Sequence, residues 1–227
     1  METKRARRLQ FGGICSITVG ILCVLTGVTH LLLPRGQLRG ASGVDSQFFE
    51  SLASNSMVFV LHYWIVVFLS ILSVAVILSL FELLQDHRSG LVSWAVVIGL
   101  FAAGLSMLDF AYVGIKAPQL AKLFVSAPQE VRSALLMWGL RTIDPCFLSW
   151  GLMGIFVITI NAYLLRYKFI KHILSIIGLI GGAFYFLLFL GSLFHVSLMI
   201  DISAVIGGVV LAPIWYIGIG FVLLSSD

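Results

Sequence analysis

Residues 91–115 form a run of apolar and small residues that contains a single carboxylate, Asp109, near its far end. A helix rises about 1.5 Å per residue, so about 20 such residues cross the ~30 Å hydrocarbon core of a bilayer. The run therefore predicts a transmembrane helix. An ionisable side chain inside such a helix is costly unless it is paired or hydrated, and by default it marks a functional site. Asp109 is for this reason the first candidate catalytic or binding residue.

Five further runs of the same kind predict five further spans. With the first, they cover residues 11–33, 57–81, 91–115, 145–165, 173–194 and 202–224. The composition agrees, because 60% of the residues are hydrophobic and only 11% are charged, against about 25% charged in soluble domains. We therefore predict an all-α, polytopic membrane protein, a six-transmembrane-helix bundle that forms one transmembrane domain over residues 1–227.

Two longer polar segments connect the predicted spans. Residues 35–56 are rich in Gly and Ser and predict a surface loop with a short helix near 48–52. Residues 116–144 form the longest segment outside the spans, and the stretch Ser126-Ala-Pro-Gln-Glu130 is typical of a helix start with Ser126 as its cap. This outer segment is expected to carry a helix at the membrane surface. In the last span, Pro213 predicts a kink.

Small and aromatic residues indicate how the spans are held in the bilayer. Small residues four apart, which let helix backbones approach each other, are Gly99 with Ala103, Gly178 with Gly182, and Gly208 with Ala212. Tryptophans near span ends, which are typical of interfacial anchors, are Trp94, Trp138, Trp150 and Trp215. We expect the three pairs to lie at helix contacts and the four indoles at the membrane surfaces.

Basic residues beside the spans predict the orientation. Eight of the fourteen Lys and Arg residues lie in the N-terminal segment and in the short turns at 82–90 and 166–172. The other six are spread over the longer segments of the opposite side. Because cytoplasmic loops carry the excess of Lys and Arg, both termini are expected in the cytoplasm, with the protein in a cell membrane of bacterial type. The basic residues are expected to contact membrane lipids and not nucleic acid.

Each predicted span also brings one ionisable residue to the outer level of the bundle. These residues are His30, His62, Asp109, Asp144, His195 and Asp201. Small residues share the helical faces of several of them, and small residues mark helix contacts in membranes. The six side chains are therefore expected to line a polar cavity that opens toward the outer leaflet.

Several chemistries suit this set of residues. Imidazole nitrogens and carboxylate oxygens bind divalent metals such as zinc or iron, with His30, His62 and His195 as ligands and Asp109 as base or orienting residue. The same set suits a polar headgroup, a quinone or a proton relay. The alternative is structural, because residues at span ends are ordinarily solvated or cap helices, and His62 and Asp109 can satisfy each other.

Three short segments carry a resemblance to known proteins. Residues 5–14 (RARRLQFGGI), 154–166 (GIFVITINAYLLR) and 172–178 (HILSIIG) resemble a widespread bacterial group of six-helix membrane proteins classed as a domain of unknown function. The resemblance supports the architecture and implies no activity, cofactor or catalytic residue.

The function expected first is non-enzymatic. The protein binds a lipid, a quinone or another small hydrophobic ligand in the outer cavity, or it is the membrane partner of a larger complex, including a homo-oligomer. The alternative is a metal-dependent intramembrane hydrolase, although no HExxH motif occurs in the chain. A transporter is the third alternative. Many transporters have broken helices at corresponding positions of their two halves, but the broken-helix candidate at Pro213 has no counterpart in the first half of this chain.

Overall fold

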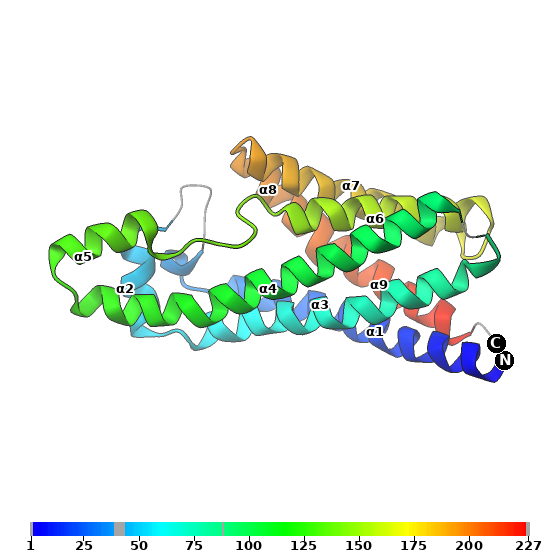
Figure 1. Cartoon of the computed structure of the whole chain (residues 1–227), viewed down its shortest axis with the longest axis horizontal. Helices are drawn as coiled ribbons and strands as arrows, with labels where there is room; N and C mark the ends of the chain where they lie inside the picture. Colours follow the sequence, from blue (N-terminus) through cyan, green and yellow to red (C-terminus); the bar gives the residue numbers. More distant parts are fainter. Residues whose placement is uncertain (1, 39–43, 88, 226–227) are drawn as a thin grey trace.

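The structure is a computed structural model that describes residues 2–38, 44–87 and 89–225 (Figure 1). In these ranges six helical spans are long and apolar enough to cross a membrane, which confirms the predicted fold class. Five are single helices, namely α1 (Glu2–Leu32), α3 (Met57–Leu83), α4 (Gly90–Ser126), α6 (Leu148–Arg166) and α7 (His172–Leu193). The sixth comprises α8 (Ser197–Ser203), a π-helical segment (Ala204–Leu211) and α9 (Ala212–Leu224).

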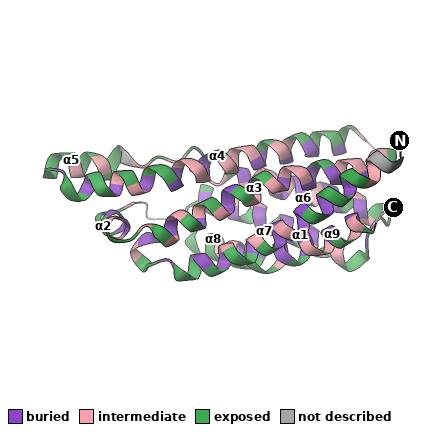
Figure 2. Cartoon of the chain, turned by 90° about the horizontal axis from the view of Figure 1, so that it is seen from below, coloured by how far each residue is buried: buried purple, intermediate pink, exposed green. Residues whose placement is uncertain are grey.

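The six spans pack in a ring that follows the order of the chain. α1 packs against α3, α3 against α4, α4 against α6 and α6 against α7, and the last span lies between α7 and α1. Buried apolar side chains such as Val19, Ile77 and Ile160 fill the centre of the ring. Figure 2 shows purple inward faces and green outward faces along the same helices. Large apolar side chains such as Phe101 stay exposed on the outward faces, as expected for surfaces in contact with lipid.

Glycines bring the backbones of α6 and α7 into contact. A Cβ atom added at Gly154 would lie 2.6 Å from the carbonyl oxygen of Gly182, and one added at Gly182 would lie 2.9 Å from that of Gly154. The Asn161 side chain fills the space beside Gly178. The predicted packing of Gly178 and Gly182 is therefore confirmed, and so is that of Gly99, which lies against Phe156 of α6.

Asn161 also explains the position of one tryptophan. Its Oδ1 accepts a hydrogen bond from Trp215 Nε1 at 2.9 Å, and its Nδ2 donates to the Val157 carbonyl at 2.8 Å. Trp215 is thus buried inside the bundle. The prediction that this indole is an interfacial anchor is wrong, because an amide of α6 supplies the acceptor that the interface would otherwise provide.

The π-helical segment of the last span ends at Leu211, two residues before Pro213, which occupies the first turn of α9. Proline has no N–H to donate and its ring crowds the preceding turn, and a π-bulge is one way in which a helix accommodates this. A π-helical turn contains more residues than an α-helical turn, so the π-helical segment changes which residues of the last span face the bundle. Gly207 lies against Phe184, whereas no atom of the described residues lies within 4 Å of a Cβ added at Gly208. The packing predicted for Gly208 is therefore wrong, while Ala212 is buried as expected.

The third span extends well beyond the predicted boundary. Its prediction ends at Ile115, but α4 continues to Ser126. Ser126 therefore ends α4 and does not cap the next helix, which is α5 (Gln129–Ala134). With 37 residues, α4 is about 55 Å long, so nearly half of it, about 25 Å, extends beyond a ~30 Å hydrocarbon core.

The projecting part of α4 forms a small helical head. We define the head as residues 33–38, 44–59 and 113–139, which include α2 (Ser46–Ser54), α5 and a π-helical turn (Leu135–Gly139). The head has its own apolar core, made of Leu33, Phe48, Phe49, Leu52, Phe59, Val113, Ala117, Ala121 and Phe124. α2 confirms the short helix predicted near 48–52. Figure 1 shows the head at one end of the long molecule, with the start of α1 and the end of α9 together at the other.

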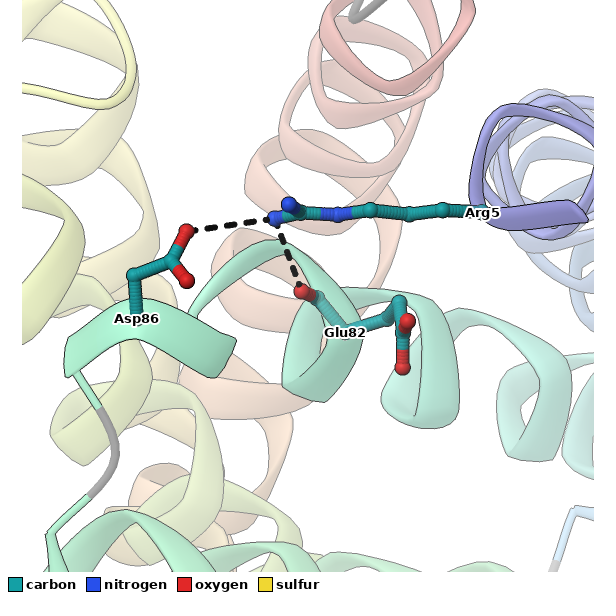
Figure 3. Close-up of polar contacts among 3 residues, drawn as sticks. All are labelled: Arg5, Glu82 and Asp86. Atoms are coloured by element: carbon teal, nitrogen blue, oxygen red, sulfur yellow. Dashed lines mark hydrogen bonds and ion pairs between the residues drawn. The ribbon is translucent and has the colours of Figure 1, made fainter. Parts of the chain in front are cut away.

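Arg5 ties α1 to the end of α3 at the end opposite the head (Figure 3). Its Nη2 donates to the Glu82 carbonyl at 3.4 Å and lies 3.6 Å from Asp86 Oδ2. In the amide orientation that satisfies both ends of Gln85, the Gln85 carbonyl accepts from Arg5 Nη1 at 3.0 Å. A cation at this position is favourable because the last carbonyls of a helix lack intrahelical donors.

We expect Arg5→Ala to lower the free energy of unfolding by only about 0.5–1 kcal/mol. The side chains of Arg5 and Asp86 are 35% and 67% exposed, so water and salt screen the ion pair. Unfolding of the purified protein in detergent at low and high salt measures the change, which is expected to shrink at high salt. Arg7→Ala, which removes an exposed cation two residues away, is the control. An equal loss in both variants would contradict a specific role for Arg5.

Candidate functional site

The structure divides the six predicted site residues into a buried and an exposed group. His62, Asp109 and Asp144 are buried, whereas His30, His195 and Asp201 are exposed. Burial makes the first three dependent on partners inside the protein, because a buried polar group without a hydrogen bond is costly. Their partners decide what each residue can do.

Asp109 fixes the chain where it returns from the head to the bundle. α4 carries this carboxylate, and its Oδ1 accepts hydrogen bonds from the backbone N–H of Ile143 at 2.7 Å and of Asp144 at 3.1 Å. Hydrogen bonds to a carboxylate are roughly twice as strong as those between neutral groups. Asp109 therefore anchors the segment that leads into α6.

Asp144 continues this arrangement by capping α6. Its Oδ1 accepts from the Leu148 N–H at 2.6 Å and its Oδ2 from the Ser149 N–H at 2.8 Å. These are N–H groups of the first helical turn, which lack acceptors within the helix. The cap encloses Phe147, which has a left-handed backbone (φ 53°) that is unfavourable for a bulky residue. Asp144 thus has the capping role that the structural alternative expects.

His62 belongs to the contact between α1 and α3. Its Nδ1 lies 2.9 Å from Thr29 Oγ1, and its ring centroid lies 5.8 Å from that of His30. The Thr29 hydroxyl is also 2.9 Å from the Leu25 carbonyl. If the hydroxyl proton goes to that carbonyl, His62 donates from Nδ1 and keeps a lone pair on Nε2. His62 and Asp109 are therefore held by different elements of the fold.

The three predicted metal ligands do not come together. In the described ranges no group of three or more His, Cys, Asp or Glu side chains is placed to hold a metal ion. His30 and His62 are neighbours, but His195 is exposed just after α7, where its left-handed backbone (φ 58°) lets the Val196 N–H bond to the Gly191 carbonyl at 2.8 Å. The expected set of His30, His62 and His195 thus lacks its third member.

A small cavity lies beside Asp109 and Asp144, but most of its wall is apolar and its lining residues differ from the predicted ones. It has a volume of about 40 Å³ and lies between α3, α4, α6, α7 and α9. Its polar lining residues are Ser70, Ser73, Ser106, Ser149, Trp150, Tyr185 and Tyr216. Ser149 donates its backbone N–H to Asp144, and Ser106 lies one turn from Asp109 on α4. The lining contains none of the six predicted residues and no charged side chain.

Trp150 is the residue of this cavity whose hydrogen bonding is incomplete. Its Nε1 is buried and has no acceptor within the described part of the chain. Its ring packs edge-on against Tyr185, with centroids 5.1 Å apart. An unsatisfied buried donor costs about 1–3 kcal/mol, so such groups usually bond to water or to a ligand. The predicted role of Trp150 as an interfacial anchor is therefore wrong.

Comparison of the chain with protein-family models, with curated proteins and with solved structures finds no match.

The cavity suits a small neutral group that accepts hydrogen bonds. A single water occupies about 10–15 Å³ of such cavity space. The cavity of about 40 Å³ therefore has room for a few waters or for the carbonyl end of a larger molecule. An ionised group would lose its hydration there without gaining a counter-charge. Ser106 accepts from Ser70 at 3.1 Å, which leaves its own proton free for such an acceptor.

The prediction from the sequence missed these lining residues, although the spacing of the serines in the apolar helices indicates them. Ser70 and Ser73 lie one turn apart in a strongly apolar helix, and Ser106 shares the helical face of Asp109. Serine is uncharged and common in spans, so it attracts less attention than an ionisable residue. The sequence pattern does not indicate that Trp150 lines the same cavity as these serines.

Proposed function

We propose that this protein is an integral membrane protein that binds a neutral, carbonyl-bearing small molecule, a quinone or a lipid, in the cavity beside Asp109 and Asp144. The observation that carries the proposal is the buried Trp150 Nε1, which has no acceptor within the described part of the chain, on a residue that lines a small cavity with four serines and no charged side chain. A carbonyl oxygen supplies the missing acceptor. The remainder of the ligand would extend between helices toward lipid, because the cavity is too small for a whole molecule.

The roles of the surrounding residues follow from their contacts. Trp150 and Ser106 would donate to the ligand, and Asp109 and Asp144 would hold the start of α6, and with it Trp150, in place through four backbone hydrogen bonds. The two carboxylates thus position the site and do not contact the ligand. This assigns Asp109 a supporting role in place of the catalytic one.

The proposed orientation places the head outside the cell. Arg166, Lys168 and Lys171 are exposed at the turn between α6 and α7, at the end opposite the head. Because an excess of Lys and Arg marks the cytoplasmic side, both termini would lie in the cytoplasm and the cavity would lie in the outer half of the membrane. A bacterial plasma membrane is the location that the resemblance of residues 5–14 supports.

Filling the cavity tests the proposal. Ser106→Leu places a branched side chain into it, while Ser93→Leu makes the same change at an exposed position of the same helix. A ligand at 100 times its Kd stabilises the native state by about 2.7 kcal/mol, which for a chain of this size raises Tm by about 5–10 °C. We expect a short-chain ubiquinone or a short-chain diacylglycerol to raise the Tm of the wild type and of Ser93→Leu by this amount, and that of Ser106→Leu by much less.

Trp150→Phe tests the hydrogen bond to the ligand in the same experiment, because it keeps an aromatic ring and removes the N–H donor. One net hydrogen bond is worth about 1–1.5 kcal/mol, so Kd should rise about tenfold. Equal Tm shifts in the wild type and in Ser106→Leu would contradict binding in the cavity. The absence of a shift in the wild type with either probe would contradict the proposed ligand class.

A further inference from the structure

An arginine with unused donors lies in the segment between the head and α6. The Arg141 guanidinium lies 4.2 Å from the centroid of the Trp138 ring, and both side chains are exposed, Trp138 by 65%. Within the described part of the chain, this stacking is the contact that Arg141 makes, and its N–H groups meet no acceptor. Stacking on an indole holds a guanidinium in one orientation and leaves its edge free.

The position of Arg141 relative to the membrane follows from the hydrogen bond between Asp109 and the backbone of Ile143. The helix from Gly90 to Asp109 is about 28 Å long, close to the ~30 Å of a hydrocarbon core. Asp109 binds the backbone of Ile143, so Ile143 lies at the head-side boundary of that core. Arg141 is two residues earlier and thus at most about 7 Å from the boundary. This distance corresponds to the headgroup region of a phospholipid bilayer.

The neighbouring side chains are also typical of a membrane interface. Ile143 and Met137 are exposed apolar residues on either side of the pair, with exposed fractions of 49% and 70%. Tryptophan is enriched at the level of lipid headgroups. An arginine at this level matches the two oxygens of a phosphate with two parallel N–H groups.

We propose that Arg141, stacked on Trp138, binds the phosphate group of a phospholipid in the head-side leaflet. Met137 and Ile143 then contact the upper part of the acyl chains. The contact holds the return segment from the head against the membrane surface. It involves none of the residues that line the cavity.

Arg132 provides a matched control, because part of its guanidinium is already hydrogen-bonded within the head. Its Nε donates to the Ala127 carbonyl and its Nη2 to the Val125 carbonyl, both at 2.9 Å. It also lies over an aromatic ring, that of Phe124, at 5.6 Å. Arg132 therefore shares the residue type and an aromatic neighbour with Arg141, but two of its five guanidinium N–H groups are held by carbonyls of the head, so fewer remain for a phosphate.

Native mass spectrometry of the full chain in a mild detergent tests the site. Phosphatidylglycerol and diacylglycerol, which lacks the phosphate, are added to the wild type, Arg141→Gln and Arg132→Gln. We expect the wild type and Arg132→Gln to retain phosphatidylglycerol with about tenfold higher affinity than Arg141→Gln, and diacylglycerol to show no such difference. Equal retention of phosphatidylglycerol by all three proteins would overturn the proposal. Displacement of the lipid by inorganic phosphate at equal concentration would assign the site to soluble phosphate and overturn it as well.

Discussion

Asp109→Ala is expected to lower the free energy of unfolding by about 3 kcal/mol. The substitution removes the acceptor of two backbone N–H groups, those of Ile143 and Asp144. A buried donor that loses its partner costs about 1–3 kcal/mol. The low dielectric of the bundle leaves little water to replace the carboxylate. Asp109→Asn keeps a carbonyl acceptor and loses the charge, so a smaller loss of about 1–2 kcal/mol is expected.

Unfolding of the purified variants in mixed detergent micelles measures these losses. Hydrogen exchange provides a local readout, because the amides of residues 143–149 should exchange faster in Asp109→Ala while those of α1 and α9 change little. Asp201→Ala removes an exposed carboxylate and is expected to stay within about 0.5 kcal/mol of the wild type. If Asp109→Ala is as stable as Asp201→Ala, the anchoring role of Asp109 is wrong.

Gly154→Ala is expected to destabilise the bundle by about 2 kcal/mol or more. The added methyl group would lie 2.6 Å from the Gly182 carbonyl oxygen and 2.8 Å from the Phe186 backbone nitrogen. Both are backbone atoms, so no side-chain rotation relieves the contact and α6 must move away from α7. Overpacking of this kind typically costs about 1–3 kcal/mol, occasionally more. A larger residue, as in Gly154→Leu, should prevent this helix contact altogether.

Gly104→Ala is the matched control, because a Cβ added at Gly104 in α4 would have no atom of residues 2–38, 44–87 or 89–225 within 4 Å. Alanine is a better helix former than glycine by about 1 kcal/mol, so this variant should be slightly more stable than the wild type. The two alanine variants are thus expected to differ by about 3 kcal/mol in unfolding experiments under the same conditions. Similar stabilities would mean that α6 and α7 do not meet at Gly154.

The helix α4 shows where a sequence-based prediction of a span reaches its limit. Hydropathy detects the part of α4 that matches the thickness of a membrane, and it places the end at Ile115. The helix continues because Ala117, Ala121 and Phe124 recur at helical spacing and pack in the core of the head. Their partners Phe49 and Leu52 come from α2. Hydropathy within one segment contains no information on such a distant partner.

The candidate site shows the same limit for function. Asp109 and His62 were correctly expected to lie in the interior, because both belong to apolar runs and small residues share the face of Asp109. Their roles depend on Thr29 and on the backbone of residues 143–144, which are far away in the chain. A polar cavity lined by six ionisable residues was expected, whereas the small cavity in the structure is lined by uncharged residues from five helices. A search for ionisable residues does not detect such a lining.

By itself, the sequence determined that six segments are long and apolar enough to span a membrane and that Asp109 needs a partner. Both conclusions rest on the cost of removing polar groups from water, which applies to any arrangement of the helices. Only the tertiary structure decided that the partner is the backbone before α6, that Trp150 has a buried donor beside a cavity, and that a head extends α4. These features depend on contacts between residues distant in the chain, and hydrogen bonds and close packing are specific only once those residues are brought together.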